Sequence, residues 1–170
     1  ALQSIVARNV DPLESAVVSI TLFQAGHTDN VIPQTALLRG TARSLRPGVR
    51  DLLEKRIVEV AEGIGKLHGA KVKAKYSRDY PVVVNNEKAV DFASSVAREI
   101  AGEANVDTKT PPVMGGEDFA FMLEARPGAF IFMGNGDSAN LHHPAYDFDD
   151  SAIPYGASYW VRLVEKSMPA

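Results

Sequence analysis

Apolar residues in the first half of the chain follow the helical period and then the strand period. Residues 1–9 place their apolar side chains on one side and predict a helix. Residues 15–26 and 35–45, rich in β-branched or alternating apolar side chains, predict two strands. The polar connection between them ends in Pro33, which cannot donate to a ladder.

A long helix is predicted next, over residues 46–69. Pro47 suits its first turn and Gly69 is placed to end it. Its apolar stripe consists of Val49, Leu52, Leu53, Ile57, Val60, Ile64 and Leu67. Residues 70–80 alternate apolar side chains with lysines, which predicts an edge strand. The order of these elements is typical of a β-α-β-β-α-β sandwich without its first strand.

The second half predicts a layered α/β domain. It contains a helix over residues 86–103, a continuously apolar run over residues 129–136 that predicts a buried central strand, and a last helix capped by Ser151. The inward positions are expected to be Ala89, Phe92, Val96 and Ile100 in the first of these helices, and Ile153, Ala157, Trp160, Val161 and Val164 in the last. Because the chain starts inside a helical pattern without an initiator Met, we expect it to be part of a longer polypeptide.

Composition narrows the classes of function. The net charge of −3 comes without a basic stretch, which argues against nucleic acid or an anionic membrane as the main partner. The absence of cysteine excludes disulfides, thiolate zinc sites and thiol catalysis, and is compatible with a reducing, cytoplasmic location. No apolar run approaches the roughly 18 residues of a membrane span.

Histidines are the first candidates for chemistry. His142 and His143 follow the predicted central strand, where loops of α/β sheets build sites. Neighbours in an extended loop point opposite ways, so at most one of them reaches a metal; a capping or packing role is the alternative. The triplet from His27 to Asp29 could bind zinc, although short polar loops contain such triplets by chance. His68, at a helix end, suits a dipole contact or plain solvent exposure.

Arg43 and a glycine pair are the candidates for anion binding. The guanidinium of Arg43, on a rigid predicted strand, could bind a carboxylate through two parallel hydrogen bonds. The alternative is an ordinary surface ion pair. Gly115 and Gly116 could open a helix whose free N–H groups attract an anion, or Glu117 and Asp118 could simply suit its first turn. Metal-dependent hydrolysis needs about three protein ligands and a carboxylate base, so these residues alone form half of a site.

Three motifs in register carry a resemblance. Residues 30–43 (NVIPQTALLRGTAR), 114–122 (MGGEDFAFM) and 141–150 (LHHPAYDFDD) resemble the second half of the hippurate hydrolase, aminoacylase and indoleacetyl-amino-acid hydrolase family of dinuclear metallo-amidohydrolases. That family implies a larger α/β catalytic domain with two divalent ions, and a smaller α+β lid that usually mediates dimerisation. We therefore expect residues 1–78 to be most of the lid and residues 79–170 to end the catalytic domain.

The resemblance also implies roles for single residues. His142 matches a metal ligand, whereas His143 occupies a variable position. Asn30 and Arg43 match lid residues that meet the substrate's carbonyl or free carboxylate, in some members from the neighbouring subunit. Gly116 stands where the family commonly has serine, so it and Gly115 are expected to offer backbone contacts only. A general-base glutamate is expected upstream of this chain.

These expectations define a metal-dependent amidohydrolase that cleaves the amide bond of N-acyl or N-aroyl amino acids with a free carboxylate. Its cofactors would be two divalent ions, zinc, manganese, cobalt or nickel, and its partners a small N-acyl amino acid and a second copy bound through the lid. The 170 residues alone are predicted to be inactive. The alternatives are a catalytically silent dimerisation module, and a periplasmic binding or transport protein that would not need His142.

Overall fold

The chain folds into two compact units. The computed structural model describes residues 1–169. The first unit consists of residues 1–82 together with 112–116, and the second of residues 83–111 and those from 117 onward. Both helices and an antiparallel sheet are present, which confirms the predicted mixed α/β class.

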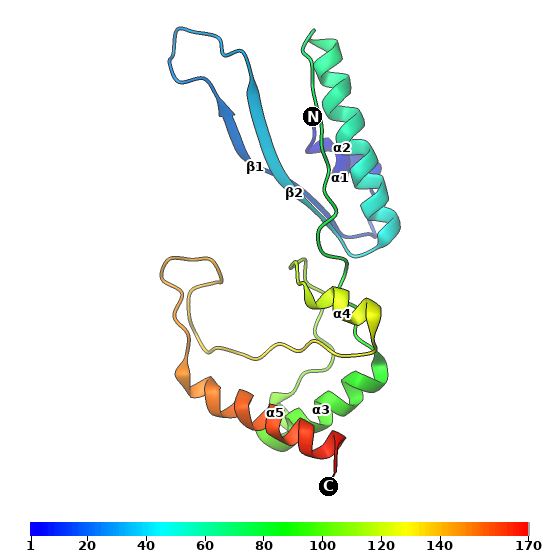
Figure 1. The fold of residues 1–170 in the computed structure, drawn as a ribbon, viewed down its shortest axis with the longest axis vertical. Coiled ribbons are helices and arrows are strands. Elements are labelled where there is room, and N and C mark those ends of the chain that lie inside the picture. The colour runs from blue at the N-terminus through cyan, green and yellow to red at the C-terminus, as the bar shows by residue number, and fades with distance from the viewer. Residues whose placement is uncertain (170) are drawn as a thin grey trace. The chain divides into compact units, whose positions relative to one another are not determined.

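The first unit packs two helices on a β-hairpin. Its elements are α1 (Ser4–Asn9), β1 (Ala16–Ala25), β2 (Ala36–Ser44) and α2 (Pro47–Leu67). The two strands pair antiparallel, and the end of the hairpin that carries the connecting loop diverges from α2 (Figure 1). The core consists of Ile5, Val10, Val18 and Leu53. The two predicted strands and both helices of this unit are therefore confirmed.

A β-bulge interrupts the hairpin. Ile20 pairs with Gly40 and Leu22 pairs with Arg39, so Thr21 is the extra residue of β1. The backbones approach so closely here that a Cβ on Gly40 would lie 2.1 Å from the carbonyl oxygen of Ser19. Glycine is therefore required at position 40.

Helix α2 ends as its sequence predicts. Gly69 has φ +68°, the Ala70 N–H donates to the carbonyl oxygen of Gly65 (2.8 Å), and the Gly69 N–H donates to that of Lys66 (3.3 Å), which is a Schellman motif. The predicted apolar stripe is buried or half-buried from Val49 to Val60. At its end, Ile64 and Leu67 are 43% and 73% exposed.

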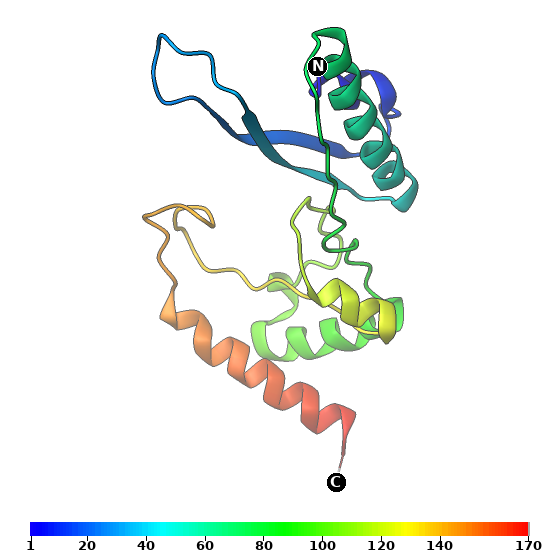
Figure 2. The same cartoon turned by 45° about the horizontal axis from the view of Figure 1, so that its top comes forward.

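The edge strand predicted at residues 70–80 is wrong. The segment is extended and runs beside α2, but it makes no ladder (Figure 2). Arg78 holds it there through ion pairs to Asp51 (2.6 Å) and Glu54, both on α2. An alternating pattern forms a strand only beside another strand, and within residues 1–169 the sheet contains β1 and β2 alone.

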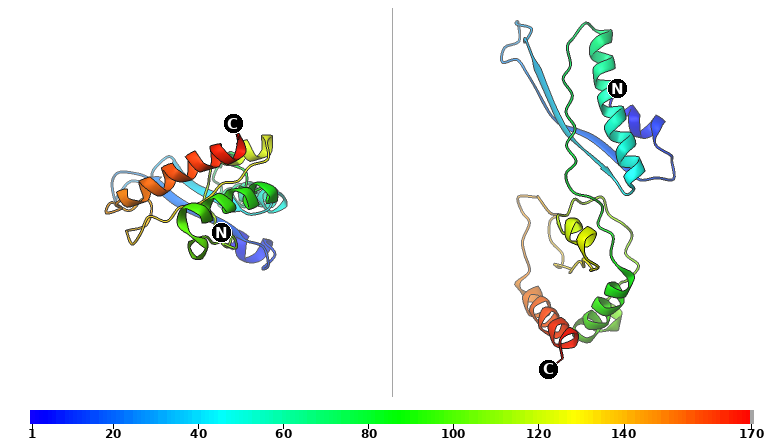
Figure 3. Two further views of the ribbon diagram at one scale, coloured as in Figure 1. Left: turned by 90° about the horizontal axis from the view of Figure 1, so that it is seen from below. Right: turned by 45° about the vertical axis from the view of Figure 1, so that its right-hand side comes forward.

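The second unit is built on two helices packed side by side. Its elements are α3 (Glu87–Ala101), η1 (Glu103–Asn105), α4 (Phe119–Ala125), η2 (Asp150–Ala152) and α5 (Ile153–Ser167). Helices α3 and α5 contact each other (Figure 3). The Asn86 side chain caps α3 by accepting the Ala89 N–H (3.2 Å). Val96 is fully buried and the other predicted inward positions of α3 are half-buried, as expected.

Two predictions about α5 are wrong. Its inward stripe consists of the buried Tyr159 and the half-buried Gly156 and Leu163, in line with the buried Ala152 of η2, whereas the predicted inward residues Trp160 and Val161 are 61% and 60% exposed. Ser151 does not cap α5: the residue before the helix is Ala152, which makes no side-chain capping bond, and Asp149 caps the preceding turn η2 by accepting the Ser151 N–H (2.9 Å). Hydrogen bonds from the hydroxyl and then the backbone N–H of Ser151 lower the pKa of Asp149.

The buried central strand predicted at residues 129–136 is also wrong. This segment is extended, but Phe132 is 71% exposed and no strand pairs with it within residues 1–169. The Asn85 carboxamide instead donates to the Phe130 carbonyl oxygen and accepts the Phe130 N–H, both at 2.8 Å.

Much apolar surface is left open on these units. The chain exposes 13,299 Å². Two compact bodies of half its mass each would expose roughly 9,800 Å² together. The excess surface includes large apolar side chains on α5 and on the hairpin. Among residues 1–169, every helix is too short or too polar to span a lipid bilayer.

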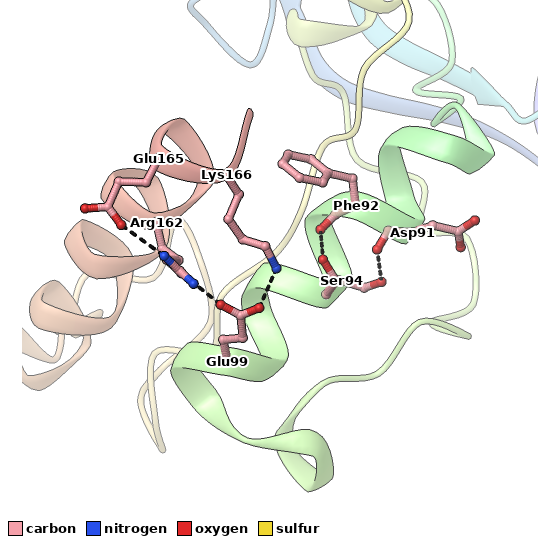
Figure 4. A network of polar contacts seen from close by, with 8 residues as sticks. Asp91, Phe92, Ser94, Glu99, Arg162, Glu165 and Lys166 are labelled. Carbon is pink, nitrogen blue, oxygen red and sulfur yellow. Dashed lines mark hydrogen bonds and ion pairs between the residues drawn. The ribbon is translucent and has the colours of Figure 1, made fainter. Parts of the chain in front are cut away.

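Ion pairs join α3 to α5. Glu99 on α3 pairs with Arg162 (2.9 Å) and with Lys166, both on α5 (Figure 4). Arg162 also contacts Glu165 one turn along its own helix (3.2 Å). The hydrogen bond from Lys166, and then that from Arg162, lowers the pKa of Glu99.

Gly40→Ala should destabilise the protein by about 1–3 kcal/mol, the usual cost of overpacking, because its methyl group would collide with backbone. Gly63→Ala in α2 is the matched control. Nothing lies within 4 Å of a Cβ at that position, so this change should stabilise the helix by about 0.5–1 kcal/mol. Urea unfolding followed by circular dichroism measures both. Equal effects of the two substitutions would contradict the close approach at Gly40.

Acidification should weaken the α3–α5 contact. A carboxyl group with a lowered folded pKa contributes stability above its unfolded pKa and loses it as the pH falls through the folded pKa. The difference in thermal unfolding midpoint between wild type and Glu99→Gln should therefore shrink between about pH 6 and pH 3, most clearly at low salt. Glu165→Gln removes a contact within α5 only and should leave most of this pH dependence in place. If the difference in unfolding midpoint between wild type and Glu99→Gln stays constant with pH, the stabilising role of the Glu99 carboxylate is contradicted.

Candidate functional site

The histidine motif lies on a loop held by hydrogen bonds rather than by packing. It belongs to the long irregular connection between α4 and α5 (Figure 2). Of residues 136–150, all are exposed except the half-buried Ala139. The Asn135 carboxamide donates to the Asp147 carbonyl oxygen and accepts the Asp149 N–H, both at 2.8 Å. The Asp147 N–H donates to the Ser138 hydroxyl oxygen (3.0 Å).

His142 has the backbone conformation that sets it apart. Its φ is +68°, and it is the only residue besides glycines with a positive φ in the described part of the chain. This left-handed conformation costs a residue with a Cβ on the order of 1–2 kcal/mol. Strain of this kind is concentrated at functional positions. The His142 side chain is exposed, and its ring makes no hydrogen bond to residues 1–169.

His143 is used by the loop itself. Its Nδ1 accepts the Ala145 N–H (3.1 Å), and its own backbone N–H and carbonyl bind Asn140 and Tyr146 (3.1 and 3.0 Å). An Nδ1 that accepts a hydrogen bond places the proton of the neutral ring on Nε2, so neither nitrogen offers a free lone pair to a metal while this bond is kept. The geometry thus separates two histidines that spacing alone left equivalent, and it leaves His142 available.

One imidazole does not make a metal centre. Within residues 1–169 no three His, Asp or Glu side chains come together in a group that could hold an ion. An exposed imidazole on a turn is nevertheless a suitable donor for zinc and the other borderline divalent metals. His142 therefore fits the part of one ligand among several.

Arg43 and the glycine pair come together in the first unit. An Nη1–H of Arg43 donates to the carbonyl oxygen of Met114, the residue before Gly115. A Cβ on Gly116 would lie 3.2 Å from Cδ2 of Tyr80, so the tyrosine ring covers the face where a serine side chain would begin. Segments that are 71 residues apart in sequence thus place a guanidinium beside the Gly-Gly backbone.

Asn30 does not join this group. It lies in the loop between β1 and β2, where its Oδ1 accepts the Thr28 hydroxyl (3.0 Å). Ala36 and Arg43 occupy opposite ends of β2, roughly 23 Å apart at the usual rise of a strand. His27 is an exposed residue of the same loop.

The helix start after Gly116 gives the anion-binding alternative little support. Helix α4 begins at Phe119, two residues later than expected. The Glu117 carboxylate already accepts the Phe119 N–H (3.2 Å), as an acid in a first turn does.

Several residues of the site escaped prediction. Asn135 lies between Gly134 and Gly136, and these glycines predict a turn. They do not predict which groups the Asn135 carboxamide binds. Tyr80 gives no signal in the sequence for its contact with a glycine 36 positions later.

Comparison with known proteins identifies the family. Residues 8–166 match the sequence model of peptidase family M20/M25/M40. The chain belongs to that family. It is 42% identical to the hippurate hydrolase of Campylobacter jejuni, over 98% of this chain and 43% of that protein. It is 38% identical to the N-acetylcysteine deacetylase of Bacillus subtilis, over 95% of this chain and 42% of that protein.

A solved relative shares the fold. The YXEP protein of Bacillus subtilis, described as a dinuclear metal-binding peptidase from the M20 family, is 36% identical with a TM-score of 0.71. The alignment covers 89% of this chain and 42% of that one. The M20 chain described here thus spans about two fifths of the length of the relatives it matches.

Proposed function

We propose that this M20 chain is the C-terminal portion of a metal-dependent amidohydrolase that cleaves N-acyl amino acids with a free carboxylate. The observation that carries the proposal is His142, an exposed imidazole held in a left-handed turn. The names of the relatives, a hippurate hydrolase and a deacetylase, support amide hydrolysis as the reaction. Residues 1–78 would form most of a lid, and residues 79–170 the end of the catalytic domain.

His142 would hold one of two divalent ions, with zinc, manganese, cobalt or nickel as candidates. When bound, such ions polarise an amide carbonyl and lower the pKa of the attacking water. The other ligands and a general-base glutamate would come from the part of the protein that corresponds to the remaining three fifths of the relatives. The 170 residues alone would then be inactive, because within residues 1–169 no group of three or more possible ligands forms around His142 or elsewhere.

Arg43 would bind the substrate's carboxylate. One of its N–H groups is used by Met114, which orients the guanidinium and leaves its other donors for a carboxylate. Gly115 and Gly116 would line the same place with backbone groups only, and the Tyr80 ring would take the space of the missing side chain.

Asn30 would donate its amide to the substrate's carbonyl group. Since Thr28 engages the Oδ1, the Nδ2 is left to donate. The length of β2 separates Asn30 from Arg43, so one small substrate would meet these two residues from different copies of the chain. This separation favours a homodimer formed through the lid.

His142→Ala in the whole protein should weaken metal binding by well over the roughly 10–100-fold that losing an outer-shell partner causes. His143→Ala is the matched neighbour and should retain most of the metal, because its ring serves the loop. Metal per protein after dialysis, measured by mass spectrometry, is the readout. Wild-type metal content in His142→Ala would refute the proposal and favour a silent dimerisation module.

Arg43→Ala should lower kcat/KM for N-acyl amino acids by about 2–4 kcal/mol of transition-state binding, the order found for breaking a charge pair. Arg43→Lys should recover little, because an ammonium lacks the planar fork. Arg39→Ala, four residues earlier on the same face of β2, is the control and should leave the kinetics unchanged. Arg43→Ala kinetics equal to those of Arg39→Ala would exclude the carboxylate role.

A further inference from the structure

One side chain joins the two ends of the histidine loop, residues 136–146, at a place that we call its neck. Asn135, just before the loop, makes hydrogen bonds to Asp147 and Asp149, just after it, so both ends of residues 136–146 are fixed at one place. Ser138 adds one more hydrogen bond on the same side, to the Asp147 N–H. His142 lies between these fixed ends.

Little else restrains this loop. Its side chains are exposed, apart from the half-buried Ala139, so packing contributes little. Gly136 at its start has φ +74° and adds backbone freedom. Inside the loop, the local turn around His143 sets the shape of residues 140–146 but does not connect them to the rest of the unit. The direction of that turn is therefore set at the neck.

We propose that Asn135 is a positioning residue for His142. Its carboxamide fixes the neck of the loop and thereby sets the direction in which the imidazole is presented to a divalent ion. The inference rests on the proposed role of His142 as a metal ligand. A ligand must be held to within a fraction of an ångström, and the groups that orient it are worth about 10–100-fold in metal affinity.

The chemistry of the side chain explains why asparagine is needed. A carboxamide offers one acceptor and one donor group on adjacent atoms, which matches the N–H of Asp149 and the carbonyl of Asp147. Asn135→Asp keeps the volume and the acceptor but loses the donor, and it places a carboxylate oxygen against the Asp147 carbonyl. Asn135→Asp should therefore weaken cobalt binding, as Asn135→Ala does.

The test measures cobalt(II) binding to the whole protein by competition with a chelator, together with the visible absorption of the bound ion. Asn135→Ala should bind cobalt about tenfold or more weakly and shift its absorption, since both report the geometry of the ligand. The metal-free unfolding midpoint should move little, because an exposed loop contributes little to global unfolding. If Asn135→Ala does not fold, Asn135→Asp carries the test.

Asn140→Ala is the matched control. It is an asparagine of the same loop whose side chain makes no hydrogen bond within the described residues. Equal cobalt affinities for Asn135→Ala and wild type, or equal losses for Asn135→Ala and Asn140→Ala, would overturn the positioning role. His142→Ala separates this failure from that of the proposed function: if it too binds cobalt normally, the metal role itself is wrong.

Discussion

Hydrogen bonds between asparagine carboxamides and the backbone hold the extended segments of the second unit in place. Backbone N–H and C=O groups need partners, and a strand normally finds them in a neighbouring strand. Within residues 1–169 this unit has no such neighbour, and Asn85 pairs with both polar groups of Phe130 instead. Asn135 does the same for Asp147 and Asp149. A carboxamide can replace a rung of a ladder because it carries the same donor and acceptor as a peptide group. The candidate ligand His142 depends on one of these replacements.

The elements that could be predicted are those whose signals are local. Pro47 and Gly69 fix the two ends of α2 through their own backbone preferences. The strands predicted at residues 15–26 and 35–45 follow each other in the chain, so each finds its pairing partner in the next segment. The strands expected at residues 70–80 and 129–136 have equally good patterns. They fail because a ladder depends on a second strand, and the pattern of one segment cannot supply its neighbour. Instead, an ion pair from Arg78 to α2 holds the first segment, and hydrogen bonds from the Asn85 side chain hold the second.

The site shows the same limit at the scale of single side chains. The resemblance proposes His142 as the ligand, and spacing alone could not distinguish it from His143; in the structure the two differ in the left-handed φ of His142 and in the hydrogen bond that the His143 Nδ1 accepts. The role of Asn135 is harder to predict because its partners lie 12 and 14 residues away along an irregular loop. The neighbouring glycines indicated only that the chain would turn there.

Helix α5 explains why an apolar pattern can be correct while the predicted face is wrong. Its residues form two apolar stripes: the predicted one, which includes Trp160 and Val161, and the one around Ala152 and Tyr159 that packs within the second unit. A helix that is apolar on two sides has no unique inward face in its sequence, so its neighbours decide. Arg162 and Lys166, three and seven residues after Tyr159, lie on that same side of α5 and pair with Glu99 of α3, whereas the Trp160 side is left open. Two apolar faces are typical of a helix that is covered from both sides. The exposed stripe of α5 is thus the surface on which this unit's own packing is incomplete.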